Sequence, residues 1–223
     1  MPVNKAKYVA LLRGINVGGK NKLSMKRLAT MFTDAGCSDV ETYIQSGNVV
    51  FAAHSSVAKG LPSSIAAAIT EQFGCRVSVV IRSAKELADV VDNNPFLKRG
   101  VDTRTLHVAF LVSVPDAKHV AELDGRRSPG DAFEIRGRHI YLRMPNGMAR
   151  SKLTNDYFDR TLKTTSTLRN WNTVQKLLEM TRNDASKGQE HDFNKEQSST
   201  TRFPDSTVGH PAGKRSYILA RSI

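Results

Sequence analysis

The order of apolar segments constrains the fold of this chain more than any other feature of its 223 residues. Two successive runs each contain a strand, a helix, two strands, a helix and a strand. The first run has predicted strands over 8–12, 40–44, 49–52 and 77–81, and helices over 24–35 and 62–73. The second has strands over 106–112, 133–135, 139–143 and 165–168, and helices over 116–123 and 153–162.

This order is the split βαβ arrangement of ferredoxin-like domains. We therefore predict an α+β fold with two tandem ferredoxin-like (βαββαβ) halves, each with an antiparallel sheet, followed by a C-terminal helix and a disordered tail. The duplication rests on element order, since no residue-level repeat is evident. The predicted domain covers 1–182, with subdomain 1 at about 5–82, a linking helix over 84–91 and subdomain 2 at about 104–182. Residues 183–223 are polar and poor in apolar side chains, which predicts disorder.

Composition indicates a soluble protein with a basic surface. Hydrophobic residues make up 39% and charged residues 24% of the chain, and the formal net charge is +12. No apolar run is long enough to span a membrane, and the first residues lack a secretory segment. The two cysteines, Cys37 and Cys75, are expected to be buried thiols, which suits a cytoplasmic location. No clustered Cys/His pattern predicts a metal or a cofactor.

The segment Arg13–Lys22 (RGINVGGKNK) follows a predicted strand and precedes a predicted helix. Glycines, cations and a helix N-terminus are a common anion-binding combination. The segment nearly matches the P-loop of nucleotide hydrolases, but Asn21 stands where the magnesium-binding hydroxyl is required. We therefore expect a simpler site for a phosphate or a carboxylate. The structural alternative is a tight turn in which the glycines serve only to allow positive φ angles.

Topology places this loop beside a second polar turn. In the predicted arrangement, the loop that leaves the first strand and the hairpin Gln45–Asn48 lie at the same end of the sheet. The two should form one rim. The candidate ligand-binding residues are Arg13, Asn16, Gly18, Gly19, Lys20, Asn21, Gln45, Ser46 and Asn48.

A secondary basic site is predicted in the second half. Its candidate residues are Arg150, Lys152, Arg169, Asn170, Trp171 and Asn172. Arg150 and Lys152 precede a predicted helix N-terminus, where positive charge and exposed amides could bind an anion. The alternative is that this segment only caps the helix on a solvated face. Trp171 is the single tryptophan, and it could be either an exposed stacking surface or an anchor in the core.

Four segments resemble one bacterial family. RGINVGGKNK, YIQSGNVVF (43–51), RSKLTN (150–155) and RNWNTVQKL (169–177) are similar to DUF1697 proteins in order and spacing, over roughly 5–181. The resemblance implies a single-domain cytoplasmic protein of α+β fold with ferredoxin-like substructure. It implies no established biochemical activity.

Three function classes stay open. The main prediction is binding of a small anionic ligand, or of a nucleic-acid backbone, at the rim. The alternatives are an enzyme acting on a phosphorylated or carboxylated metabolite and a protein-interaction module that uses a basic face. The predicted central strands offer few aromatic side chains for base stacking. His107 and His139 are expected to be structural, so no general base can be named.

Overall fold

The structure is a computed structural model, and it describes residues 5–16 and 22–182. The predicted disordered tail, 183–223, lies outside the described residues. The strands are β1 (Ala6–Leu12), β2 (Ser38–Tyr43), β3 (Asn48–Ala53), β4 (Val79–Ser83), β5 (Leu106–Leu111), β6 (Ala132–Arg136), β7 (His139–Arg143) and β8 (Ser166–Asn170). The helices are α1 (Met25–Asp34), α2 (Ser55–Phe73), α3 (Ala84–Asp92), α4 (Ala117–Ala121), α5 (Asn155–Leu162) and α6 (Trp171–Arg182), with 3₁₀ turns η1 (Leu97–Arg99), η2 (Thr103–Thr105) and η3 (Met148–Arg150).

The strands form two four-stranded sheets with matching orders, β2-β3-β1-β4 and β6-β7-β5-β8. Every neighbouring pair is antiparallel. This confirms the predicted α+β class and the two-sheet organisation. In register, Val9 of β1 lies opposite Arg82 of β4, and Val108 of β5 lies opposite Arg169 of β8. Each arginine thus comes from the last strand of its own half.

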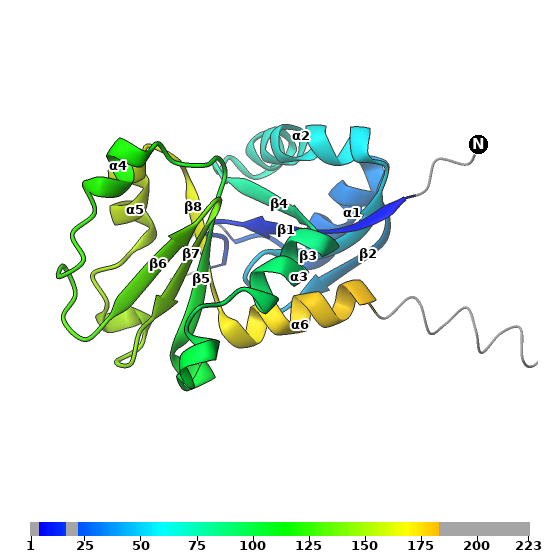
Figure 1. The fold of residues 1–223 in the computed structure, drawn as a ribbon. Helices are drawn as coiled ribbons and strands as arrows, with labels where there is room; N and C mark the ends of the chain where they lie inside the picture. Colours follow the sequence, from blue (N-terminus) through cyan, green and yellow to red (C-terminus); the bar gives the residue numbers. More distant parts are fainter. Residues whose placement is uncertain (1–4, 17–21, 183–223) are drawn as a thin grey trace, which may run out of the picture. The chain divides into compact units, whose positions relative to one another are not determined.

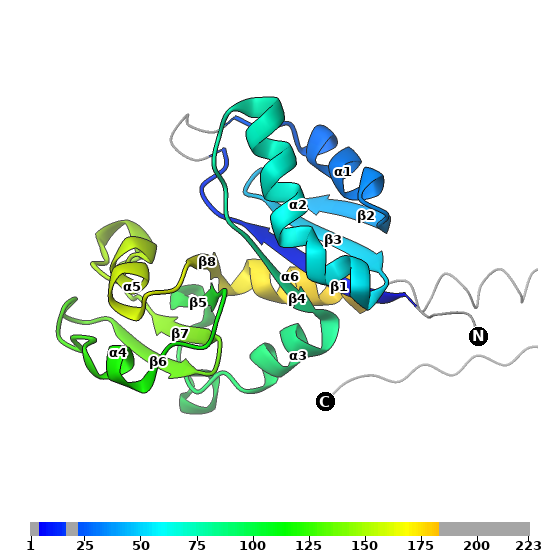
Figure 2. The same ribbon diagram turned by 90° about the horizontal axis from the view of Figure 1, so that it is seen from above.

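Three apolar clusters hold the elements in layers (Figures 1 and 2). One face of the first sheet packs against α1 and α2, through residues such as Phe51, Phe32 and Ile65. The other face joins α3, α6 and the second sheet in one cluster that includes Val9 and Val108. The far face of the second sheet packs against α5. Since one cluster reaches both sheets, burial of apolar surface ties the two halves together.

Helix α2 begins seven residues before the helix predicted from the sequence. The prediction began it at Pro62, but the helix spans Ser55–Phe73 and contains that proline. Its buried face runs through Ala58, Leu61 and Ile65 across the proline. The burial of this continuous face outweighs the loss of one backbone donor.

Among the described residues, no helix is long and apolar enough to cross a membrane.

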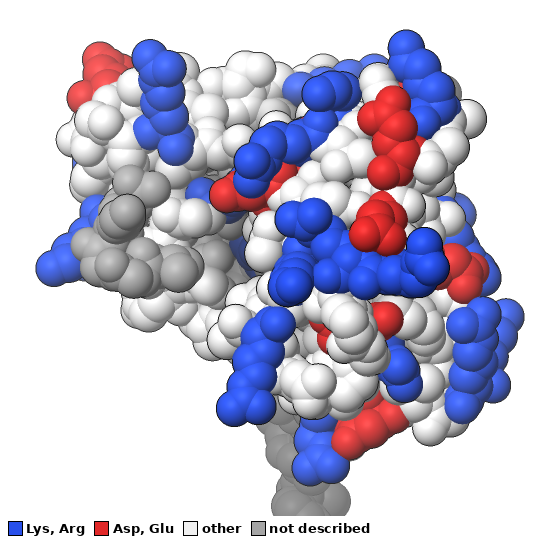
Figure 3. Space-filling view, turned by 90° about the vertical axis from the view of Figure 1, so that its left-hand side faces the viewer, with Lys and Arg blue, Asp and Glu red and all other residues white. Residues whose placement is uncertain are grey.

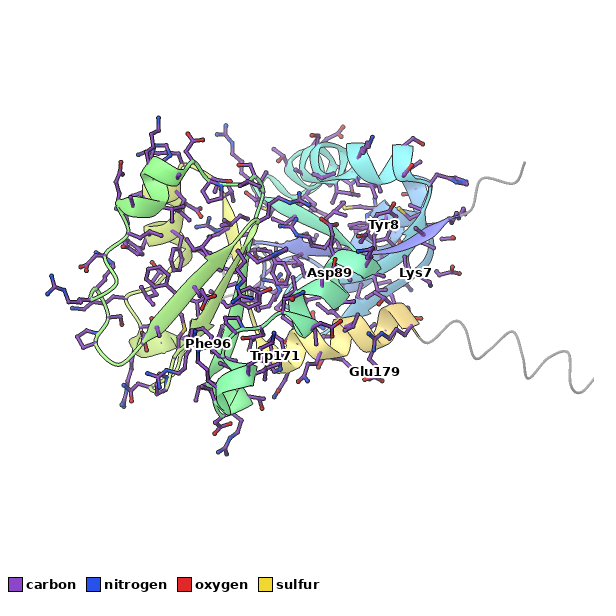
Figure 4. All side chains as sticks on the ribbon, in the orientation of Figure 1. Lys7, Tyr8, Asp89, Phe96, Trp171 and Glu179 are labelled. Carbon is purple, nitrogen blue, oxygen red and sulfur yellow. The ribbon has the colours of Figure 1, made fainter. Side chains whose placement is uncertain are left out.

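Trp171 opens α6 and belongs to the core. Its side chain is 1% exposed and shares a cluster with Phe96 and Val174; Figure 4 shows Trp171 and Phe96 in the same region, near the start of α6. Of the two alternatives for Trp171, the exposed stacking surface is therefore excluded, because the ring is covered by the elements that join the halves. The core alternative is confirmed.

Candidate functional site

Asn16 joins the first loop to the β2–β3 hairpin. Its side-chain amide donates to the Leu23 and Gln45 carbonyl oxygens, both at 2.9 Å, and its Oδ1 accepts from the Leu23 amide at 2.8 Å. The loop and the hairpin are therefore adjacent, as the topology predicted. Asn16 thus uses its side chain to hold the backbone of the loop and the hairpin, and Gln45 takes part through its main-chain carbonyl. The predicted ligand-binding residues Gly18, Gly19, Lys20 and Asn21 lie outside the described residues.

Arg13 bridges the two halves through an ion-pair cluster. Its guanidinium bonds to Asp156 at 2.5 Å and to Asp159, both on α5. The Asp159 carboxylate also accepts from the backbone and hydroxyl of Ser166, both at 2.7 Å. Sequence reasoning expected Arg13 to supply positive charge to a ligand. Two carboxylates balance that charge instead, so the cluster as a whole is not cationic.

Arg169 is the buried cation at the rim. The residue is 9% exposed, and burial lowers the pKa of its guanidinium to about 10. The guanidinium donates to Asn48 Oδ1 (2.6 Å), Leu12 O (2.7 Å), Thr167 Oγ1 (2.8 Å), Leu168 O (2.9 Å), Ser46 O (3.2 Å) and Gly47 O (3.4 Å). Its five N–H groups thus meet neutral oxygen atoms only. Asn48 is fully buried and positions Arg169, which differs from its predicted contact with a ligand.

Arg82 makes the reciprocal contact from the first half. It is 1% exposed and donates from Nη2 to the carbonyl oxygens of Leu111 (2.5 Å) and Arg138 (3.2 Å). Its Nε donates to His139 Nε2 at 3.0 Å, and its Nη1 to the Ile81 carbonyl at 2.9 Å. Each arginine therefore leaves the last strand of one half and binds the first strand and the hairpin of the other. We call Arg82 and Arg169 the reciprocal arginine pair.

The reciprocal arginine pair reveals a residue-level correspondence that sequence reasoning missed. Segment 8–12 (YVALL) corresponds to 107–111 (HVAFL), since Val9 faces Arg82 and Val108 faces Arg169. The strand ends match as well, because Leu12 N donates to Gly47 O at 2.8 Å and Leu111 N to Arg138 O at 2.9 Å. The shared V-A-x-L segment was the available signal.

A pocket of about 460 Å³ lies where the first loop, the β2–β3 hairpin and β8 meet. We call it the rim pocket. Its polar lining includes Arg13, Ser46, His107, Asn155, Arg169 and Asn170. Arg13 and Ser46 come from the first predicted set of ligand-binding residues, and Arg169 and Asn170 from the secondary one. The structure therefore brings parts of both predicted sites into one pocket.

Two exposed apolar side chains, Ile44 and Met148, also line the rim pocket. Ile44 is 51% exposed and has a φ of 47°, in the left-handed region. A β-branched residue is strained there, and such strain persists where surrounding structure imposes it. The rim pocket thus combines polar groups with a small apolar edge.

His107 is the functional candidate that sequence reasoning set aside. The residue is 8% exposed, and Nδ1 lies 3.3 Å from the Thr105 carbonyl oxygen. Because a carbonyl only accepts, Nδ1 carries the proton and Nε2 is the basic nitrogen. Burial lowers the pKa of His107 more than the Thr105 bond and Asp131 raise it. The imidazole is therefore a neutral base in the wall of the rim pocket.

The remaining residues of the predicted secondary basic site do not line the rim pocket. Arg150 and Lys152 are exposed before α5, and Asn172 is exposed on α6. Lys and Arg side chains gather across the side that carries α4, α5 and β6, with Asp and Glu among them (Figure 3). Arg136 pairs with Glu134 and Arg138 with Glu86, so part of the basic face is neutralised. Among the described residues, no three His, Cys, Asp or Glu side chains could hold a metal ion together.

A family model described as "Protein of unknown function (DUF1697)" matches residues 6–141. The chain belongs to this family. Among solved structures, the conserved bacterial protein SP0830 from Streptococcus pneumoniae is similar, with a TM-score of 0.63 and 24% sequence identity. The match covers 80% of this chain and 99% of that one, and it shows that the two proteins share a fold. No curated protein matches the sequence significantly.

Proposed function

We propose that the rim pocket of this DUF1697 protein binds a small ligand that carries a phosphate or carboxylate group. The observation that carries the proposal is the buried positive charge of Arg169. Its charge is buried in the pocket wall, and among the described residues it bonds to no carboxylate. A charge in low-dielectric surroundings is weakly screened, so it attracts an anion without direct contact.

The direct donors come from other side chains. Asn170 uses Oδ1 to accept from the Thr173 amide at 2.8 Å, which leaves its NH₂ group for a ligand. The side-chain amide of Asn155 lies 3.1 Å from the Ser166 hydroxyl, which donates its hydrogen to Asp159. These amides line the same pocket as Arg169. The glycines and Lys20 of the first loop remain predicted contributors.

We also propose that each half is a ferredoxin-like unit within a domain covering 1–182. The matching strand orders and the antiparallel pairing of both sheets support this assignment. The duplication then explains why the two halves offer equivalent arginines.

Asn170→Asp tests the ligand proposal with little structural change. The new carboxylate keeps the acceptor for the Thr173 amide at the start of α6, but it adds negative charge beside Arg169. In a thermal-shift and calorimetry panel of phosphorylated and carboxylated metabolites, including phosphoglycolate, we expect at least tenfold weaker binding. Asn146→Asp, an exposed position outside the pocket lining, should bind normally. Equal affinity in both variants, or a panel without binders, contradicts the proposal.

Binding of a nucleic-acid backbone gives a different result. Affinity for a single-stranded oligonucleotide would fall steeply and smoothly with salt, because counterions are released. It would respond alike to Asn170→Asp and Asn146→Asp if the general basic surface carried it. That outcome would replace the small-ligand proposal.

His107 favours an enzyme as the second candidate. A neutral imidazole with a fixed tautomer, next to an anion-attracting pocket, can remove a proton from a bound substrate. For any panel compound that binds and is turned over, His107→Asn should lower kcat by at least about 100-fold. Retention of kcat would limit His107 to a structural role.

A further inference from the structure

A second pocket, of about 470 Å³, lies along β4 at the place in the first half that corresponds to the rim pocket. We call it the edge pocket. Several of its lining residues correspond to rim-pocket residues, among them Tyr8 to His107, Arg82 to Arg169 and Val112 to Arg13. The last correspondence follows from the backbone, since Arg13 N donates to Ser78 O and Val112 N to Thr165 O, both at 2.9 Å.

The two pockets differ in chemistry. Where the rim pocket has the Arg13–aspartate cluster, the edge pocket has Val112, whose side chain is 49% exposed. The rest of its apolar lining comprises Tyr8, Ala58, Pro62, Val79, Val80 and Ile81. An apolar body of ligand size fits a pocket of this volume and lining.

The charged lining of the edge pocket is cationic. Lys59, Arg82 and Arg138 face a single carboxylate, Glu86, which Arg138 already binds. The first turn of α2 contains no acidic residue, and its first residue, Ser55, also lines the pocket. The pocket therefore favours a negatively charged group.

Arg82 holds an unused donor at this pocket. In the second half, Nη1 of Arg169 donates to both the Leu168 carbonyl and the Thr167 hydroxyl. Val80 stands at the position that corresponds to Thr167, because it faces Leu11 as Thr167 faces Phe110. Nη1 of Arg82 therefore reaches only the Ile81 carbonyl among the described residues, and its second N–H has no acceptor. A buried donor without a partner is costly unless a ligand supplies an oxygen.

We propose that the edge pocket binds an organic anion with an apolar body, whose carboxylate or phosphate oxygen accepts from Nη1 of Arg82. Its apolar body lies against Tyr8, Ile81 and Val112. The site is separate from the rim pocket, and no residue of the rim-pocket test takes part in it.

The first test restores the missing acceptor. Val80→Thr places at this position the hydroxyl that the other half has at Thr167, so it competes with the ligand for the same N–H. With 4-phenylbutyrate and phenyl phosphate as calorimetric probes, we expect at least fivefold weaker binding in Val80→Thr. The neutral 4-phenylbutyramide should bind wild type at least tenfold more weakly than 4-phenylbutyrate.

The second test leaves the core untouched. Val112→Asp places a carboxylate in the pocket lining and should weaken binding of both anions at least tenfold. Val114→Asp is the matched control, because Val114 is 65% exposed and lies outside the lining. Binding of one probe alone assigns the carboxylate or the phosphate as the anionic group. Absence of binding by both anions, equal effects of the two aspartates, or unchanged affinity in Val80→Thr overturns the proposal.

Discussion

Acidification from pH 8 to pH 5 should destabilise the wild-type protein more than the variant His139→Asn. His139 Nε2 accepts from Arg82 Nε at 3.0 Å, so the imidazole must be neutral at that nitrogen. Burial, followed by the charges of Arg82 and Arg138, lowers the pKa of His139 from 6.5 to about 4. Protonation would remove the acceptor and place two cations in contact.

The size of the effect follows from the two pKa values. A neutral His139 favours the folded state, so its contribution is complete above the unfolded pKa of 6.5 and is lost as the pH falls toward 4. The full difference is roughly 3 kcal/mol, at about 1.4 kcal/mol for each pH unit. At pH 5 the linkage relation gives a loss of about 2 kcal/mol from this group.

Asparagine is the matched replacement because the other half uses it. Asn48 occupies the corresponding position and accepts from Arg169 Nε at 2.6 Å without titrating. Urea unfolding, followed by the fluorescence of the buried Trp171, should be measured at pH 8, 6.5 and 5. His107 and Glu86 also have shifted pKa values, but both proteins contain them, so their contributions cancel in the difference. Parallel stability curves for wild type and His139→Asn would refute the reasoning.

Two further substitutions test the rim. Gly47→Ala would place a Cβ 2.8 Å from Leu12 Cβ and 2.9 Å from Ile15 at a φ of 75°, so we expect a loss above about 3 kcal/mol in urea unfolding. Gly36→Ala, with a φ of 90° and open space, should lose only about 1–2 kcal/mol, and equal losses would contradict the packing argument. Ile44→Asn should raise the free energy of unfolding by about 1 kcal/mol, because asparagine tolerates the left-handed region better. A lower stability would mean that the apolar contacts of Ile44 outweigh its backbone strain.

Local patterns predicted the elements and one part of the rim. Alternating apolar residues and turn signals placed the strands, and topology alone placed the first loop beside the β2–β3 hairpin, where Asn16 now contacts Gln45. Helix α2 was predicted too short because Pro62 was taken as its first residue, although the apolar spacing continues before it. Pattern outweighs a single proline when the helix is buried on one side.

The roles of the arginines were not accessible from local patterns. Arg13 looked like a free cation because its partners, Asp156 and Asp159, are more than 140 residues away in sequence. Arg169 looked like part of a basic surface segment, yet the packing of one half on the other buries it. Both outcomes depend on how the halves meet, which no periodicity within one strand or helix encodes.

The reciprocal arginine pair makes each half depend on the other. Leu12 and Leu111 end the first strand of each half, and their carbonyl oxygens accept from an arginine of the opposite half. A half on its own would expose its guanidinium to water, lose these acceptors and uncover the apolar residues of the cluster that both halves share. The same construction creates two equivalent pockets, and divergence at a few positions then separates them. The exchange of Thr167 for Val80 leaves a donor unused, and the exchange of Arg13 for Val112 makes the wall apolar. On the two proposals above, two copies of one framework bind two different anions without any change of fold.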